Sequence, residues 1–176
     1  MKSIWVAFYH ARPTTWRQKI VAWWTKSPYL HSELILPEGI TVGICPDEEG
    51  VVRMVQEDCC GASDDWEKIE LKVTDSQLTN IIRFYEQTAG QKYDWIGMVV
   101  SQFVPYMIKH DRKWYCSQWI AHALITAGIF PITYEKISPG RLHEMVVNIA
   151  LQQHLDLDNA EPYDENENIK PSLIKG

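Results

Sequence analysis

The stretch KWYCSQWIAHALITAG, residues 113–128, constrains the fold more than any other part of the chain. Its apolar residues recur at helical spacing after Cys116, and Gly128 suits the left-handed conformation that ends many helices. The pattern therefore predicts a short extended lead-in and then a helix that begins at Cys116. Unpaired backbone N–H groups and the helix dipole at that end favour a thiolate over a thiol.

A thiolate at neutral pH is the nucleophile that a cysteine hydrolase or acyltransferase needs. The alternative interpretation of Cys116 is a small buried apolar residue, the usual role of a free cysteine. His31, on a predicted strand far upstream, favours the catalytic interpretation. An imidazole can take the thiol proton and later protonate a leaving group. The alternative for His31 is a structural histidine whose hydrogen bonds are satisfied within the strand.

Composition fits one globular domain and excludes several classes of protein. The chain has 176 residues, 45% of them apolar, and a net charge of −6. This length allows a sizeable core, and the negative charge argues against nucleic-acid binding, which needs a basic face. We expect no membrane span, because no apolar run is long enough. We expect synthesis in a cytoplasm, because His10 and Arg12 interrupt the apolar N-terminal run and leave no signal peptide.

The cysteines are expected to be free thiols, and no cofactor or metal is expected. The chain has four of them: Cys45, Cys59, Cys60 and Cys116. No pair has the C-x-x-C spacing of a zinc site, and a bridge between adjacent cysteines would be strained. A metal at His31 and Glu33 would need a third ligand that the spacing does not supply.

Hydrophobic patterns predict the order of the elements. Strands are expected over residues 2–9, 30–36, 40–45, 51–56 and 66–73. Helices are expected from Thr14 or Thr15 to about residue 26, from the Thr74–Gln77 capping box to about Ala89, from Tyr93 to Pro105, from Cys116, and from Ser138 to about His154. The order indicates an α+β fold in which helices flank an antiparallel sheet. We expect a single domain over residues 1–155 and an acidic, mobile tail over residues 156–176.

Several motifs in this order resemble the circularly permuted papain-like cysteine hydrolase superfamily. HSELIL, residues 31–36, is similar to the H-x-E-[LI]-[VI] strand of that family, and YCSQWIAHAL, residues 115–124, is similar to its Y-C-S-E helix start. The group is NlpC-type and includes the YiiX-like proteins and the lecithin retinol acyltransferases; its histidine precedes its cysteine. The segments WWTKSPYLHSEL, GVVR, GQKYDWIG and ISPGRLHEM resemble a phage-encoded branch. The resemblance covers about residues 4–147.

The resemblance implies a permuted papain-like fold with Cys116 as nucleophile and His31 as base. It implies a thiol protease or amidase that hydrolyses amide bonds in peptides or peptidoglycan stems through a thioester, or an enzyme that transfers acyl groups. For a bacteriophage protein it implies synthesis in the host cytoplasm and arrival at the wall with the virion or after lysis. Phage structural proteins are the partners that this implies.

The residue that orients the histidine ring is where the sequence departs from the family. With a turn near Glu38, the position opposite His31 falls near Cys45, and Asp47 follows. Neither is a carboxylate or histidine in mid-strand. Glu33, on the same strand face, is an orienting residue, a substrate contact, or a structural carboxylate paired with a lysine or arginine. The structural carboxylate is favoured, because neighbouring side chains on one face of a strand run side by side and seldom hydrogen-bond each other well.

Two further residues near the cysteine are candidates for the site. The backbone N–H of Cys116 is the expected oxyanion donor. Gln118 could assist it and Tyr115 could line the groove, with a solvent-facing role and a packing role as their alternatives.

Two other functions stay open. One is a phage virion or host-interaction protein that keeps the fold with weak or no catalysis, which the missing orienting residue and the acidic tail motivate. The other is a thioester acyltransferase at a membrane. It would need an apolar entry surface, for which Trp16, Trp23 and Trp24 are the candidates.

Overall fold

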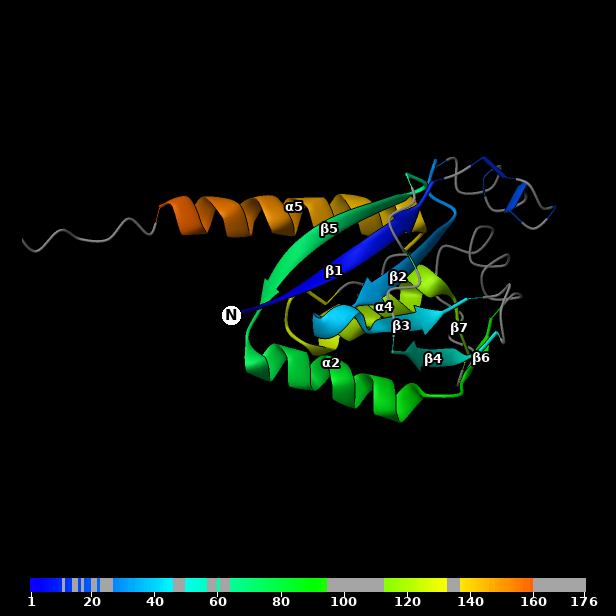
Figure 1. Cartoon of the computed structure of the whole chain (residues 1–176), viewed down its shortest axis with the longest axis horizontal. Helices are drawn as coiled ribbons and strands as arrows, with labels where there is room; N and C mark the ends of the chain where they lie inside the picture. The colour runs from blue at the N-terminus through cyan, green and yellow to red at the C-terminus, as the bar shows by residue number, and fades with distance from the viewer. Residues whose placement is uncertain are drawn as a thin grey trace, which may run out of the picture.

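The fold is α+β, and the described residues form a five-stranded antiparallel sheet with helices packed against it (Figure 1). The computed structural model describes residues 1–10, 12–13, 16, 18–19, 22, 27–45, 50–56, 60, 64–94, 113–132 and 137–159. The strand order β4-β3-β2-β1-β5 puts β2 in the middle of the sheet. This fold class is the one that the hydrophobic patterns predict.

The five predicted strands are confirmed to within one residue at each end. They are β1 (Lys2–Tyr9), β2 (His31–Ile35), β3 (Thr41–Ile44), β4 (Val52–Val55) and β5 (Trp66–Val73). All neighbouring pairs run antiparallel. A short 3-10 turn, η1 (Pro37–Gly39), joins β2 to β3, and Glu38 and Gly39 both adopt positive φ there, 67° and 75°. The turn fixes the register of the hairpin that carries His31.

The helices whose bounds the structure describes are α2 (Asp75–Thr88), α4 (Cys116–Thr126) and α5 (Pro139–Asp158). The predicted capping box starts α2: Thr74 Oγ1 accepts from the Gln77 N–H, and Gln77 Oε1 accepts from the Thr74 N–H. Helix α4 starts at Cys116, as predicted, and Gly128 follows it with φ of 71°. Helix α5 continues past residue 155, where the domain was expected to end, and the chain from residue 160 lies outside the described residues.

The core lies between one face of the sheet and the helices. Its fully buried strand residues alternate along β1, β2 and β5, and they include Ile4, Val6, Phe8, Leu34 and Leu71. Helix α4 packs against β2 and β3, α5 packs against β5, and α2 packs against α4. The buried Trp119 of α4 donates to Thr88 Oγ1 of α2 at 2.9 Å. Helix α4 therefore contacts the middle strand, β2, and α2 at the same time.

One predicted helix begins differently in the structure. Tyr93 belongs to β6 (Lys92–Tyr93), which pairs in parallel with β7 (Lys113–Trp114). The Tyr93 N–H donates to the Gly50 carbonyl at 2.8 Å, so a backbone partner from a distant segment fixes an extended conformation here. The prediction of a helix start at Tyr93 is therefore wrong, and residues 95–112 lie outside the described residues.

Of the helix predicted up to residue 26, residues 16, 18, 19 and 22 are described and are helical. In the part of the chain that the structure describes, no helix combines the length and apolarity that crossing a membrane would require.

Candidate active site

Cys116 is the first residue of α4, and short backbone pairings fix its position. Strand β7 ends just before it, and β7 pairs with β6. A bridge between Val51 and Lys92 links β6 to the start of β4. The Asp94 N–H also donates to the Trp114 carbonyl at 2.7 Å. The cysteine is therefore attached to the main sheet through a continuous series of backbone contacts.

The structure brings Cys116 together with His31, the first residue of β2. The imidazole and the Cys116 sulfur are hydrogen-bonded to each other. Cys116 is 4% exposed, and the His31 side chain is 14% exposed. A nucleophile and a base are thus in direct contact at a helix N-terminus.

Electrostatics at this pair favour the ionised form. Burial alone would raise the pKa of the Cys116 thiol, but the charge and hydrogen bond of His31 outweigh burial and lower it. Backbone N–H groups of Ser32 and Ser117 also bond the sulfur. Burial alone would lower the pKa of His31, but the Cys116 thiolate and hydrogen bonds to Cys116, Cys45 and Glu33 raise it well above its ordinary value. Both shifts stabilise a thiolate–imidazolium pair.

Glu33 holds the imidazole from its other side. His31 Nε2 donates to Glu33 Oε1 at 2.8 Å, which leaves Nδ1 to face the sulfur. The Arg53 guanidinium donates to both carboxylate oxygens, at 3.1 and 3.3 Å. Burial alone would raise the pKa of Glu33, but His31 and Arg53 lower it, so the carboxylate stays ionised. A carboxylate in this position fixes the orientation and tautomer of the ring.

Both contacts of Glu33 exist together, whereas the sequence favoured the arginine or lysine partner alone. The reason is Gly43, which pairs with Arg53 across β3 and β4 and stands opposite Glu33 in the β2–β3 register. A Cβ at Gly43 would collide with Glu33 Oε2. The missing side chain therefore lets the carboxylate lean over β3 and reach His31 and Arg53 at once. His31, Glu33 and Cys116 are called the thiol cluster below.

Cys45 lies beside His31, as the predicted hairpin register requires. The antiparallel pairing of β2 and β3 sets the two residues opposite each other, and the Cys45 side chain hydrogen-bonds the imidazole. Asp47, the other residue predicted to lie near the imidazole, is outside the described residues. Cys45, Cys60 and Cys116 are all free thiols, as expected, and Cys59 is not described.

The two candidates beside the cysteine have different surroundings. Tyr115 precedes the helix and is 6% exposed within the main core cluster, so packing is its evident role. Gln118 is half-buried in the first turn of α4.

Tyr93 is a residue of the site that the sequence analysis missed. Its hydroxyl hydrogen-bonds Cys116, and burial together with the charges of Cys116 and Cys45 raises its pKa well above the usual value. The phenol therefore keeps its proton and can donate. The parallel pairing of β6 with β7 brings it here, and no local motif announces such a pairing.

A second histidine–carboxylate group, the tyrosine cluster, consists of Tyr29, Glu67 and His143. The Tyr29 hydroxyl donates to Glu67 Oε2 at 2.6 Å, and His143 Nε2 lies 2.9 Å from that hydroxyl and 3.1 Å from Glu67 Oε1. The rings of Tyr29 and His143 stack at 4.3 Å. Burial and the Glu67 carboxylate raise the pKa of Tyr29 to about 12. This cluster ties β5 to α5 and holds its hydroxyl neutral.

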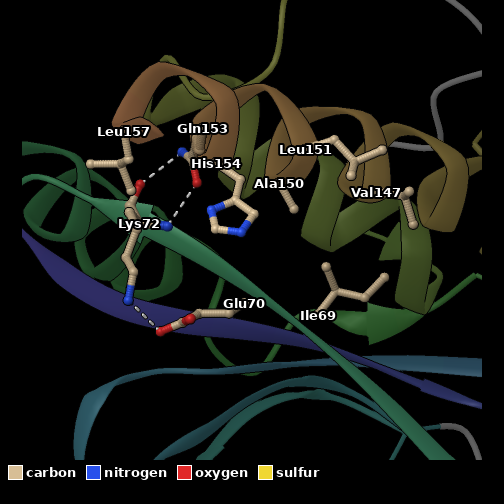
Figure 2. Close-up of a pocket in the computed structure, with 9 residues that line it drawn as sticks. All are labelled: Ile69, Glu70, Lys72, Val147, Ala150, Leu151, Gln153, His154 and Leu157. Carbon is tan, nitrogen blue, oxygen red and sulfur yellow. Dashed lines mark hydrogen bonds and ion pairs between the residues drawn. The ribbon is translucent and has the colours of Figure 1, made fainter. Parts of the chain in front are cut away.

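A hollow of about 370 Å³ lies between β5 and α5, and apolar side chains of α5 line much of it (Figure 2). Gln153 spans the backbone of Lys72: its Oε1 accepts from the Lys72 N–H at 2.8 Å, and its Nε2 donates to the Lys72 carbonyl at 2.9 Å. Lys72 also pairs with Glu70 at the rim. The residues that line the hollow include no cysteine, and the candidate chemistry therefore stays with the thiol cluster.

No protein-family model matches the sequence, and no curated protein matches it. The functional proposal for this chain therefore depends on the geometry of the thiol cluster and on the sequence motifs.

Proposed function

We propose that the chain is a cysteine-dependent amide hydrolase of the permuted papain-like fold. The observation that carries the proposal is the hydrogen-bonded pair of Cys116 and His31, with Glu33 on the other imidazole nitrogen. The element order supports it, because the histidine strand precedes the cysteine helix and the helix packs against that strand. A nucleophile and a base in contact are the parts that thiol hydrolysis uses, and an orienting group raises its rate by fixing the tautomer and angle of the ring.

In the proposed reaction the Cys116 thiolate attacks the carbonyl carbon of an amide. The backbone N–H groups at the start of α4 and the Tyr93 hydroxyl, released from the sulfur, donate to the resulting oxyanion. The C–N bond breaks as the His31 imidazolium protonates the leaving amine, which leaves a thioester. Neutral His31 then takes a proton from water, the hydroxide oxygen attacks the thioester, and the acid departs with the thiolate–imidazolium pair restored.

The proposed substrate class is a peptide or a peptidoglycan stem, and it rests on the motif resemblance rather than on the site. The same resemblance supports a phage protein that is made in the host cytoplasm and acts with phage structural proteins. The chemistry of the site requires only an acyl group whose carbonyl can reach the sulfur.

The structure bears differently on the two alternative functions. The interaction-protein alternative was motivated in part by a missing orienting residue, and the Glu33–His31 hydrogen bond removes that motive. The acyltransferase alternative needs an exposed apolar surface. Trp16 is 68% exposed, while Trp23 and Trp24 lie outside the described residues. A transferase would differ only in the acceptor that resolves the thioester.

The test is the pH dependence of alkylation at each cysteine by iodoacetamide, read by mass spectrometry in the wild type and in His31→Ala. We expect Cys116 to react below the pH at which an ordinary thiol reacts, and to lose this reactivity without His31. A short cysteine-containing peptide alkylated in the same mixture is the reference, because the Cys45 side chain itself hydrogen-bonds the His31 imidazole and would respond to His31→Ala.

Reaction of Cys116 with the pH profile of an ordinary thiol would contradict the proposal. So would a profile that His31→Ala leaves unchanged. Accumulation of an acyl group on Cys116 from a chromogenic ester, seen as a mass increase, separates an acylating enzyme from an activated thiol without turnover.

A further inference from the structure

Three potential metal ligands, two from β2 and one that directly follows β3, converge beside the Cys116 sulfur. An imidazole nitrogen of His31, a carboxylate oxygen of Glu33 and the sulfur of Cys45 all lie within 4.8 Å of one another. Glu33 is buried, and the other two are half-buried. Cys45 is the third ligand that the spacing of the sequence did not supply.

The sheet itself preorganises this group. The β2–β3 register sets Cys45 opposite His31, and the carboxylate of Glu33 leans into the space that Gly43 leaves open. A tetrahedral zinc ion separates an imidazole nitrogen and a thiolate sulfur by about 3.5 Å. His31 Nε2 and Glu33 Oε1 lie 2.8 Å apart and need to separate to about 3.4 Å around the ion, which side-chain rotation supplies without moving the strands.

The kinds of ligand select the cation. One nitrogen, one sulfur and one oxygen suit Zn²⁺, whereas Mg²⁺ and Ca²⁺ prefer oxygen ligands alone. Ionised Glu33 and Cys45 with a neutral imidazole also balance the charge of a dication. Arg53, bonded to Glu33 at 3.1 Å, can remain as an outer partner that orients the carboxylate.

We infer that His31, Glu33 and Cys45 form a Zn²⁺ site with water in the fourth position, and that bound zinc inhibits the enzyme by occupying its base. The inhibition rests on the proposed function; the binding does not. On binding, the Cys45 thiol and the His31 Nε2–H release their protons to solvent, and zinc replaces the N–H···O bond to Glu33. A zinc-bound ring no longer cycles between imidazole and imidazolium, so turnover falls while zinc stays bound.

The experiment titrates Co²⁺, a spectroscopic substitute for Zn²⁺, into the full-length chain after chelator treatment in a thiol-free reductant. We expect one Co²⁺ per chain, with a thiolate-to-cobalt charge-transfer band that Zn²⁺ removes. Cys45→Ser should abolish the band and weaken Zn²⁺ binding by roughly 100-fold, at least the loss typical of outer-shell changes. Cys60→Ser is the matched control, because Cys60 lies in a separate cluster with Ala7 and Ile35 and should keep the band.

A second readout needs neither a spectrum nor activity: Zn²⁺ should protect Cys45 from iodoacetamide, and the Glu33→Gln variant should show less protection. Absence of a band, or a band that survives Cys45→Ser, overturns the zinc site. Binding that leaves ester turnover unchanged overturns the inhibition. If low-pH reactivity of Cys116 is absent while the cobalt band is present, the hydrolase proposal fails and the metal site stands. If low-pH reactivity of Cys116 is present while the cobalt band is absent, the metal site fails and the hydrolase proposal stands.

Discussion

The thiol cluster and the tyrosine cluster contain similar parts in different surroundings. Each joins a histidine to a glutamate and to a third group with a dissociable proton. In the thiol cluster the Glu33 side chain is 3% exposed, and in the tyrosine cluster the Glu67 side chain is 42% exposed. The pKa of the Cys116 thiol is lowered, whereas the pKa of the Tyr29 hydroxyl is raised to about 12.

The difference lies in which charge faces the third group. Cys116 faces an imidazolium and the N–H groups of a helix start, which both stabilise an anion. Tyr29 donates to a carboxylate, so losing its proton would set two negative charges side by side. A histidine and a glutamate in contact therefore do not define an active site. The order of contacts does: the imidazole must stand between the carboxylate and the nucleophile.

The largest expected effect compares the two histidines in turnover of a chromogenic ester. His31→Ala should lower kcat/KM by roughly 100- to 10,000-fold, the usual contribution of a general base. His143→Ala should keep it within about twofold, because His143 contacts Tyr29 and Glu67 rather than the groups of the acid–base steps. Equal losses of kcat/KM in both variants would contradict the assignment of His31, rather than His143, as the base. Steady-state kinetics at neutral pH, with circular dichroism as a folding control, decides this.

Stability should separate the two glutamates. Glu33→Ala leaves a mostly buried Arg53 without this carboxylate and should lower the free energy of unfolding by about 3–5 kcal/mol. Glu67→Ala removes contacts of a half-exposed carboxylate and should cost about 1 kcal/mol. Urea unfolding at pH 7 measures both. A larger loss for Glu67→Ala would contradict the burial argument.

Gly43→Ala tests the space that Glu33 needs. The new Cβ would occupy the position of the carboxylate, so we expect a loss of about 1–3 kcal/mol from overpacking and a rise in the pKa of the Cys116 thiol. Gly140→Ala is the matched control, because its Cβ meets Ser27 in a different region. It should leave Cys116 alkylation unchanged. Unaltered Cys116 reactivity in Gly43→Ala would show that the ring does not depend on this carboxylate.

Acid titration sharpens the contrast further. The pKa of Glu33 is lowered in the folded state, so its stabilising contribution is present above the ordinary value of 4.5 and is lost as pH falls through the folded pKa. Each proton taken up on unfolding changes stability by about 1.4 kcal/mol per pH unit. Glu33→Gln should therefore flatten the acid limb of the stability curve more than Glu67→Gln does. Equal flattening would show that exposure does not discriminate the two carboxylates.

The smallest effect compares two tyrosines. Tyr29→Phe removes a part-buried hydrogen bond and should cost about 0.5–1.5 kcal/mol without changing Cys116 alkylation. Tyr93→Phe removes a donor to the thiolate and should raise the pKa of Cys116, moving its alkylation profile to higher pH. If the pH profile of Cys116 alkylation in Tyr93→Phe matches the wild type, Tyr93 does not stabilise the thiolate.

Sequence patterns predict the parts of this molecule that depend on local or paired periodicity. The strands, the α2 capping box, the helix start at Cys116 and the position of Cys45 opposite His31 all follow from spacing within one segment or one hairpin. The role of Glu33 does not, because it depends on a glycine on a second strand and an arginine on a third. Tyr93 reaches the sulfur through a parallel pairing between distant segments, and no periodicity encodes that contact.

The amide of Gln153 has a consequence for how the protein behaves in concentrated solution. Strand β5 is an outer strand of the sheet, and an outer strand offers backbone groups that can template pairing with another chain. At Lys72 the glutamine already occupies the N–H and the carbonyl that such pairing would use. A chain that adds a strand here must first undock α5, so helix docking and resistance to edge-to-edge polymerisation are one property.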